Sequence, residues 1–504
     1  MYEVVLTTDR TMMSNHHGKE FLGFLATGPA IKIPEKIWFW LASPPVKVDE
    51  LGRPREAPYG IRKVEAILVD AGFKAAIIDP DHLYKHLGTM QVLLLGHHDY
   101  FAYGPPSSEW WSITGKEPIN RVSFKKLMES PAVRKAREKG VRIIAGGPGA
   151  WQWLWELDLW RKWGVDTVIE GEVERVIVDL VEKALNKEDL PAYIYVGPHD
   201  SPSIDEIPVI KGASVNGLVE IMRGCPRGCR FCSVTNKPLR FIPISKIIEE
   251  VRVNVRNGVT GAILHSEDVL LYGGEGVKPR PEPLKKLHEA VTKEIGEKGS
   301  LAWSHVSLSA VKYAEEEYGL VGDLMENYVL TGERRYIGVE VGIETGSPEL
   351  AKKIMYAKSA PYPTEKWPEV VEDAFSIMHE NSIIPAATLI LGLPEETSED
   401  LVKTVELLDR LKPYRSVIIP MFFVPMGALK NREWFLRDHI KPEHIDVLLK
   451  CFYHTLHWAE EIMKKYYMKE FHMFPARLLL RLFMWLVKRE VERVVSRLEY
   501  RLKQ

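Results

Sequence analysis

The chain has 504 residues, of which 45% are hydrophobic, and its formal net charge is −2. This length and apolar content suffice for two or three packed domains, and the near-neutral charge gives no strong signal for nucleic acid or another polyanion. No run of about 18 apolar residues occurs, so no helix is predicted to cross a membrane. The N-terminal residues lack the basic and apolar regions of a secretory signal, and we expect a cytoplasmic protein.

From about residue 35 onward, short apolar runs alternate with helix-like segments. The predicted strands are Ile37–Ala42, Ala75–Ile78, Val92–Gly96, Val141–Ala145 and Thr167–Glu170. The predicted helices between them include Gly60–Ala71, Phe124–Lys139 and Glu174–Leu185. Strands alternating with helices indicate a parallel, doubly wound sheet, whose ligands bind at the carboxyl ends of the strands. We expect this Rossmann-like domain over residues 35–190, after an extension of uncertain structure over residues 1–34.

A second strand–helix series follows a segment rich in Pro, Asp and Ser, which we interpret as a linker over residues 191–215. Its predicted strands are Leu218–Met222, Gly261–His265, Leu301–Val306, Ile337–Ile343, Ala387–Gly392 and Val417–Val424. Six such units predict a parallel partial barrel over residues 216–430, with its chemistry on the C-terminal rim. Residues 431–504 are predicted to be mostly helical. The expected fold class is α/β, with a Rossmann-like domain, a partial (β/α)6 barrel of the TIM type and a C-terminal helical region.

Three of the four cysteines, Cys225, Cys229 and Cys232, lie within eight positions directly after the first strand predicted for the barrel. Thiolates at this spacing can all reach one iron–sulfur cluster. Three ligands on a four-iron cube leave one iron without a protein ligand, and an open coordination position is the mark of a catalytic metal. The triplet therefore predicts a catalytic [4Fe–4S] cluster on the active rim.

Two other metal sites use cysteines in a similar way. A structural zinc ion takes four ligands, and an electron-transfer cluster also takes a fourth thiolate. The remaining cysteine, Cys451, is more than 200 residues from the triplet in a region predicted to be helical. We interpret Cys451 as a small buried apolar side chain, which leaves both alternatives one ligand short.

The CxxxCxxC spacing, with the aromatic Phe231 before the last cysteine, resembles the radical S-adenosylmethionine (SAM) superfamily. The resemblance implies that the amino and carboxylate groups of SAM chelate the open iron. It also implies that one electron, from a donor of the ferredoxin or flavodoxin type, cleaves the sulfonium and yields a 5′-deoxyadenosyl radical. That radical abstracts hydrogen from an unreactive carbon, while the protein orients the reactants and excludes water.

The resemblance extends over roughly residues 216–430 and suggests further SAM-binding residues. Ser266-Glu267-Asp268 stands where the superfamily often has acidic residues near the SAM amino group, and Ser304 and Ser307 follow at the third strand. Gly342-Ile343-Glu344-Thr345-Gly346 resembles a "G-I-E-S-G" turn, which implies that Glu344 faces the SAM ribose or the substrate. Gly392-Leu393-Pro394 resembles the "G-L-P-G-E-T" segment whose backbone approaches adenine, although Glu395 replaces a glycine. Each acid has the alternative of a solvated loop residue or a helix cap.

Many radical SAM proteins carry a cobalamin-binding domain upstream of the barrel, and residues 35–190 are similar to it. The residues that carry this likeness are Gly146, Gly147, Pro148 and Gly149 after the fourth predicted strand, and Glu170, Gly171 and Glu172 after the fifth. Neither His82 nor His97 satisfies the Asp-x-His-x-x-Gly motif, so a bound cobalamin would lack that histidine ligand. The alternative is a domain that binds no cofactor, because glycine spacing alone is not specific.

Two aromatic-rich segments leave the substrate open. Five tryptophans, Trp151, Trp153, Trp155, Trp160 and Trp163, are interpreted as packing between domains or as the wall of an apolar cavity. Residues 475–503 form a predicted basic amphipathic helix that packs on the protein or lies peripherally on a membrane surface.

These features predict a cobalamin-dependent radical SAM enzyme that functionalises an unactivated carbon, with methyl transfer as the leading reaction. We expect the substrate to be a small molecule or a lipid. One alternative is a radical SAM enzyme that forms carbon–carbon bonds or rings in a membrane lipid of the archaeal type. An alternative of another class is a non-catalytic regulatory protein that binds an iron–sulfur cluster or cobalamin.

Overall fold

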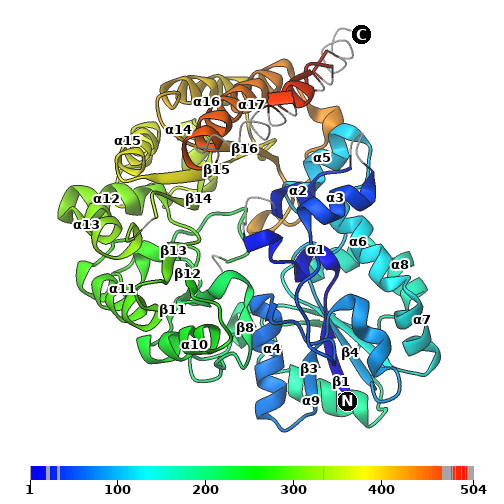
Figure 1. Ribbon diagram of the computed structural model, residues 1–504. Helices are drawn as coiled ribbons and strands as arrows, with labels where there is room; N and C mark the ends of the chain where they lie inside the picture. Colours follow the sequence, from blue (N-terminus) through cyan, green and yellow to red (C-terminus); the bar gives the residue numbers. More distant parts are fainter. Residues whose placement is uncertain are drawn as a thin grey trace. The chain divides into compact units, whose positions relative to one another are not determined.

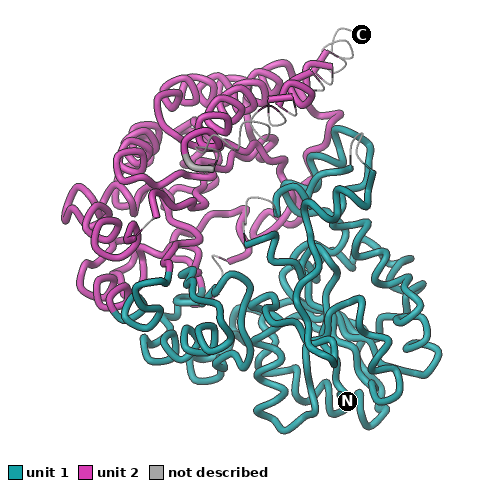
Figure 2. Tube along the Cα trace, viewed as in Figure 1, with its two compact units in different colours: residues 1–223, 240–264, 290–299 teal, residues 224–239, 265–289, 300–504 magenta. Residues whose placement is uncertain are grey.

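The computed structural model describes residues 2–18, 23–30, 34–234, 237–332 and 334–467, together with 478, 481–482, 484–489, 491–493 and 495–496. The chain forms two compact units, which Figure 2 distinguishes by colour. Unit 1 comprises residues 1–223, 240–264 and 290–299. Unit 2 comprises residues 224–239, 265–289 and 300–504 and contains the cysteine triplet.

Unit 1 is built on a six-stranded parallel sheet (Figure 1). In sheet order its strands are β3 (Ala75–Ile77), β1 (Val4–Thr7), β4 (Val92–Gly96), β5 (Arg142–Gly146), β6 (Thr167–Glu170) and β7 (Tyr193–Tyr195). Its helices up to residue 185 are α1 (Arg10–Met13), α2 (Phe24–Thr27), α3 (Glu35–Ala42), α4 (Tyr59–Asp70), α5 (Ser107–Thr114), α6 (Ile119–Met128), α7 (Pro131–Glu138), α8 (Leu157–Trp163) and α9 (Ile177–Leu185). The central strands are apolar on both faces, as expected of a parallel sheet covered by helices.

The strand order of this sheet defines where a ligand would bind. The chain passes from β1 outward to β3 and then returns to β4 on the other side of β1. The loops that follow β1 and β4 therefore diverge, and such a switch point is the usual ligand crevice of an open parallel sheet. Asp9 and His97 lie in these two loops.

Four expectations from the sequence differ from the structure of unit 1. Residues 37–42, predicted as a strand, belong to helix α3, where Trp38 and Ala42 are buried one turn apart while Trp40 is exposed. The expected N-terminal extension contains β1, because a four-residue apolar run is too short to show a period. The expected linker contains β7. The predicted helix over 124–139 is two helices, since the Ser130 side chain caps α7 and Pro131 occupies its first turn.

The rest of unit 1 leads to the cysteine loop. Its remaining elements are β2 (Glu56–Ala57), which pairs with β8 (Ala213–Ser214), then β9 (Leu218–Glu220), β10 (Met222–Arg223), β11 (Arg240–Phe241), α10 (Ile244–Arg256) and β12 (Gly261–His265), whose last residue belongs to unit 2. Strands β10 and β11 form an antiparallel pair, and the loop that carries the triplet leaves from one and returns to the other.

Unit 2 contains a three-stranded parallel sheet covered by helices (Figure 1). Its strands are β13 (Ser300–Trp303), β14 (Ile337–Glu344), β15 (Ile383–Leu391) and β16 (Val417–Phe422), of which the last three form that sheet. Its helices are α12 (Leu308–Tyr318), α13 (Leu320–Leu324), α14 (Pro348–Ile354), α15 (Trp367–Glu380), α16 (Ser398–Arg410) and α17 (Pro442–Ile462), and α11 (Pro281–Ile295) runs from unit 2 into unit 1. The six strands predicted for the barrel and the α/β fold class are confirmed.

Of the two aromatic-rich segments, the structure describes the tryptophan-rich one in full and only part of the C-terminal one. Trp153 and Trp163 are fully buried in the core of unit 1 against Tyr100, Phe101 and Phe124, so their packing is internal to that unit. Most of the predicted helix over residues 475–503 lies outside the described residues. None of the described helices combines the length and apolar character that crossing a bilayer requires.

Candidate active site

The three cysteines of the triplet lie in one loop of unit 2, between β10 and β11. All three are free thiols; Cys229 is buried, and Cys225 and Cys232 are half-buried. Burial raises the pKa of the Cys225 thiol to about 12 and also raises the pKa of Cys229. Metal binding must displace these protons, because thiolates are the ligands. No three His, Cys, Asp or Glu side chains among the described residues converge on a single metal ion.

Arg227, inside the triplet, fastens the loop to the rest of unit 2. Its side chain is only 3% exposed. One terminal nitrogen donates to the main-chain carbonyls of Lys358 and Ala360, at 3.1 and 2.9 Å. The other lies 3.4 Å from a carboxylate oxygen of Asp268. We call residues 224–239, the loop that carries the triplet, the cluster loop. The guanidinium thus ties this loop both to the segment after α14 and to Asp268, one of the acids predicted to bind SAM.

Main-chain contacts hold the same loop from two further segments. The Arg230 N–H donates to the carbonyl of Ile354 at 2.9 Å, and the Arg230 carbonyl accepts from the Ala428 N–H at 2.8 Å. Gly427 has a left-handed backbone, and a Cβ atom there would lie 2.6 Å from the carbonyl oxygen of Cys232. The segment over residues 425–427 therefore packs directly on the cluster loop.

One carboxylate oxygen of Asp268 is available to accept a hydrogen bond from a ligand. It is buried, it accepts a short hydrogen bond from Ser307 through Oδ2, and its Oδ1 has no partner within the described residues. The hydroxyl of buried Ser266 also lacks a partner there. Burial raises the pKa of Asp268, and Arg227 and Ser307 offset only part of that rise. Unsatisfied buried acceptors fit the amino group of SAM, whereas Glu267 is exposed.

Glu344 lies at the end of β14 and is paired rather than solvated. It adopts a left-handed backbone conformation, with φ of +62°, and its side chain is buried. The Lys358 ammonium donates to one carboxylate oxygen, and the Thr388 hydroxyl donates to the other at 3.2 Å. Burial lowers the pKa of Lys358, but Glu344, Cys229 and Cys232 together more than offset this, and the net pKa is raised. Lys358 also lies 5.8 Å from the centre of the Phe231 ring.

Ser304 belongs to a polar cluster in which two histidines take part. Its hydroxyl lies 3.1 Å from Nδ1 of His265 and 2.9 Å from Nδ1 of His305. Nε2 of His305 contacts the Glu340 carboxylate at 2.8 Å. Glu340 is half exposed on the face of β14 opposite the helices, so this cluster lines the open face of the sheet.

Gly392 is required by the packing around it. Its φ is +77°, and a Cβ atom would overlap the Phe435 ring. Its N–H donates to the Glu396 carboxylate at 2.9 Å, and the same oxygen contacts Nε2 of His444 at 2.8 Å. Glu395, which stands in place of the usual glycine, takes a left-handed conformation with φ of +71°.

At the switch point of unit 1, a buried hydrogen bond between two side chains joins the loops after β1 and β4. Nε2 of His97 lies 2.8 Å from Oδ1 of Asp9, and both side chains are almost wholly buried. Burial alone would raise the pKa of Asp9, but His97, Ser123 and Thr11 together outweigh it and bring the pKa to about 2. His97 is therefore occupied within the protein, whereas the next residue, His98, is exposed.

The glycine segment after β5 packs against the same loop. A Cβ atom on Gly147 would lie 2.9 Å from the His97 carbonyl oxygen, and one on Gly149 would lie 2.7 Å from that of His98. Gly146 has only ordinary contacts, and Pro148 is exposed. Internal packing therefore accounts for Gly147 and Gly149, with or without a cofactor at this edge.

The turn after β6 also has internal partners. The Glu170 carboxylate accepts from the Tyr193 hydroxyl at 2.5 Å. Gly171 has a φ of +119°, and a Cβ atom there would lie 2.3 Å from the Val196 carbonyl oxygen. Both oxygens of Glu172 accept from Arg240 at 3.0 Å.

Sequence reasoning missed the residues that hold the site together, above all Arg227, Lys358, His305 and Glu340. The position of Arg227 inside the triplet was a signal that could have been used. For Lys358 and His305 there was none, because a single sequence does not distinguish a buried lysine or histidine from a solvated one. Their roles depend on contacts across 14 or more positions of the chain, such as Lys358 with Glu344.

Residues 219–408 match the model of the radical SAM superfamily. This range contains the triplet, Asp268, Glu344 and Gly392. The chain therefore carries a radical SAM domain, and the resemblance first seen in the cysteine spacing is confirmed.

Several curated proteins are similar to this chain. A threonylcarbamoyladenosine tRNA methylthiotransferase of Mus musculus is 22% identical over 64% of this chain and 53% of its own length. A tRNA-2-methylthio-N(6)-dimethylallyladenosine synthase of Thermotoga petrophila is 24% identical over 49% of this chain and 51% of its own length. An uncharacterised protein of Methanopyrus kandleri is 26% identical over 38% of this chain and 34% of its own length. The chain thus spans only about a third to a half of these relatives.

Two solved structures share the fold over more of the chain. The radical SAM methyltransferase TsrM from Kitasatospora setae, with cobalamin and a [4Fe–4S] cluster bound, superposes with a TM-score of 0.54 at 14% identity. That match covers 90% of this chain and 78% of TsrM. TsrM with tryptophan and the SAM analogue aza-SAM gives a TM-score of 0.53 over 85% of this chain and 75% of TsrM.

Proposed function

We propose that this chain is a cobalamin-dependent radical SAM enzyme that methylates an unactivated carbon. The observation that carries the proposal is the buried Oδ1 of Asp268, which has no partner among the described residues. This side chain lies beside the Arg227-anchored triplet in a radical SAM domain. Cys225, Cys229 and Cys232 would hold a [4Fe–4S] cluster, and Asp268 and Ser266 would accept from the SAM amino group. When bound, the cluster and SAM supply the electron transfer and the carbon radical.

The chain's own residues orient and enclose the reactants. Arg227 and the Arg230 main chain hold the cluster loop. The Glu344–Lys358 pair supplies a buried polar wall beside Phe231. Cobalamin would lie at the switch point of unit 1, bordered by the loops after β1, β4 and β5 and by Glu170 and Gly171. The electron donor would be an external ferredoxin or flavodoxin. We assign the barrel to residues 216–430 and the helical region to residues 431–504.

Methyl transfer is favoured over methylthio transfer, the reaction named for two of the relatives. Sulfur insertion consumes a sulfur atom that something must supply. Apart from the triplet the chain has one cysteine, Cys451, and that side chain is fully buried in α17. The chain therefore offers no accessible thiol beyond the three proposed cluster ligands.

The test is anaerobic reconstitution with iron and sulfide, followed by SAM and dithionite. The wild-type protein is expected to release 5′-deoxyadenosine, and a Cys232→Ala variant is expected to release none. Cys451→Ala is the matched control and should retain activity. Methyl transfer adds S-adenosylhomocysteine once substrate is present, whereas a wild-type protein that forms no 5′-deoxyadenosine would support a regulatory role instead.

A second candidate is carbon–carbon bond or ring formation in a membrane lipid. It is favoured by the exposure of four apolar residues of the C-terminal region, Leu478, Leu482, Trp485 and Leu486. Such residues next to Arg481, Lys488 and Arg489 suit a peripheral contact with an anionic membrane. This candidate predicts 5′-deoxyadenosine without S-adenosylhomocysteine, and sedimentation of the protein with anionic but not neutral vesicles.

A further inference from the structure

The cluster loop connects the two strands of a hairpin, and the facing residues at its two ends are both arginines. Arg223 on β10 and Arg240 on β11 are direct cross-strand partners. Arg223 immediately precedes the glycine before the first cysteine, and Arg240 follows the end of the loop. Like charges directly opposite each other on a strand pair repel. This hairpin therefore closes only if carboxylates lie between or beside the two guanidinium groups.

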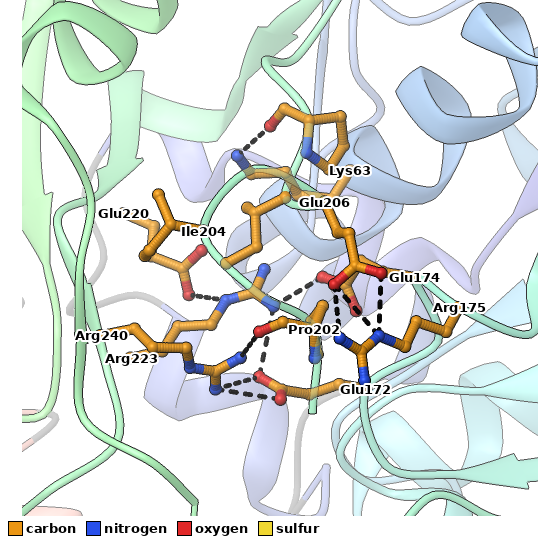
Figure 3. Close-up of polar contacts among 12 residues, drawn as sticks. Lys63, Glu172, Glu174, Arg175, Pro202, Ile204, Glu206, Glu220, Arg223 and Arg240 are labelled. Atoms are coloured by element: carbon orange, nitrogen blue, oxygen red, sulfur yellow. Dashed lines mark hydrogen bonds and ion pairs between the residues drawn. The ribbon is translucent and has the colours of Figure 1, made fainter. Parts of the chain in front are cut away.

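Glu172, from the turn after β6, supplies the shared carboxylate (Figure 3). Its oxygens accept two hydrogen bonds from Arg240 at 3.0 Å and one from Arg223 at 3.2 Å. Glu174 and Glu220 complete the pairing of Arg223, at 2.5 and 2.9 Å. Arg240 also donates to the carbonyl of Pro202 at 2.6 Å.

The network is shielded from solvent. The side chain of Glu172 is 9% exposed, and those of the two arginines are 12% and 9% exposed. Burial alone lowers the pKa of Arg223, but the surrounding carboxylates more than offset this and raise it. Buried charge pairs of this kind are costly to break, because the remaining partner is left without its counter-charge. Glu172 is the only carboxylate in Figure 3 that contacts both arginines.

We propose that Glu172 is a positioning residue for the cluster-binding loop: by bridging Arg223 and Arg240 it clamps the two ends of that loop together. The proposal rests on the proposed function only in that the loop carries a [4Fe–4S] cluster. It gives the Gly171-Glu172-Val173-Glu174 turn a task in the iron–sulfur site, in place of the contact with cobalamin that its resemblance implies.

The test compares full-length Glu172→Gln with the wild type after anaerobic reconstitution. Arg175→Gln is the matched control, because Arg175 lies on the same turn and forms an exposed ion pair with Glu206. Glu172→Gln is expected to retain about tenfold less iron per chain after exchange with a chelator, the usual loss when a supporting residue is removed. Glu172→Asp, which keeps the charge, should restore part of it. Cobalamin retention, read from visible absorption, should match the wild type.

Two results would overturn the proposal. One is a Glu172→Gln protein with wild-type iron retention and an unchanged reduction potential of the cluster. The other is a protein that keeps its iron and loses cobalamin, which would return Glu172 to the cobalamin site. Limited trypsin cleavage at exposed Arg230 reads the clamp without any cofactor: we expect faster cleavage in Glu172→Gln than in Arg175→Gln. If the wild type binds no cluster, the proposed function fails, and equal cleavage rates would then also exclude the clamp.

Discussion

Asp268 lies beside the triplet, and one of its carboxylate oxygens can still accept a hydrogen bond. One oxygen is held by Ser307 and Arg227, and the other is buried without a partner among the described residues. Its neighbour Glu267 is exposed. The two adjacent carboxylates therefore differ in environment, and only the buried one is placed to bind a cation with little competition from water.

We predict that Asp268→Asn weakens SAM binding about tenfold, because a hydrogen bond to a charged group contributes about 1.5–3 kcal/mol. Glu267→Gln is the control and should change SAM binding little. The measurement is the SAM-induced change in the electron paramagnetic resonance spectrum of the reduced cluster, titrated with SAM. Equal effects of the two substitutions would contradict the assignment.

His288 is a buried neutral histidine in unit 2. Its Nδ1–H donates to the Leu284 carbonyl at 2.7 Å, and its Nε2 accepts from the Trp303 indole N–H at 2.8 Å. Burial lowers its pKa to about 4. The folded protein therefore resists protonation at this site, while the unfolded chain takes up a proton near pH 6.5.

We predict that the burial of neutral His288 makes the folded protein less stable in acid. Because the folded pKa lies below the unfolded one, stability is complete above about pH 6.5 and falls between there and about pH 4, by about 3 kcal/mol in all. Denaturant unfolding measured across that range should show the slope. A His288→Gln variant should show a flatter one, and an unchanged slope would remove His288 as its cause.

At the scale of elements, the cluster loop is fastened by segments distant in sequence. It contacts the end of α14, the main chain at Lys358 and Ala360, and the turn after β16. These contacts fix the loop through backbone groups and one arginine, so the local sequence around the cysteines does not determine its position alone. At Gly427, in the turn after β16, an added Cβ atom would meet the carbonyl oxygen of Cys232.

We predict that Gly427→Ala disturbs the cluster loop. The added methyl group would lie 2.6 Å from the Cys232 carbonyl oxygen, so one of the two segments must move. Gly276→Ala is the control, because Gly276 has a similar φ of +60° but nothing within 4 Å of its Cβ position. Both variants should lose about 1 kcal/mol of stability to backbone strain. Only Gly427→Ala should also lower the iron retained per chain, and equal iron in both would argue against the contact.

At the scale of the whole molecule, unit 1 has the strand order of sheets that bind a ligand at the β1–β4 switch point. Gly147 and Gly149 there are explained by contacts with the His97–Asp99 loop. Whether cobalamin binds at this edge can therefore be tested by measuring how the ligand changes the stability of the protein, without any turnover.

We predict that hydroxocobalamin stabilises the protein against thermal unfolding, by about 2.7 kcal/mol at one hundred times its dissociation constant. FMN is the comparison ligand, because sheets with this strand order also accept flavin at the same edge. A shift in midpoint temperature with FMN and none with hydroxocobalamin would reassign the site to a flavin.

The cysteine spacing by itself determined the superfamily, and the alternation of apolar runs determined the α/β class and the six strands of the second domain. These signals are local: ligand spacing, strand periodicity and caps such as Thr397 before α16 act within a few residues. The short apolar runs near the N-terminus were ambiguous for the same reason, and strand β1 and helix α3 were misassigned.

Only the tertiary structure decided which charged groups are buried together. Glu172 meets Arg223 and Arg240 across 51 and 68 positions, and Lys358 meets Glu344 across 14. A carboxylate has the same local pattern whether it is solvated or clamps two guanidinium groups. Its role follows from burial and from partners that the chain brings together only when it folds.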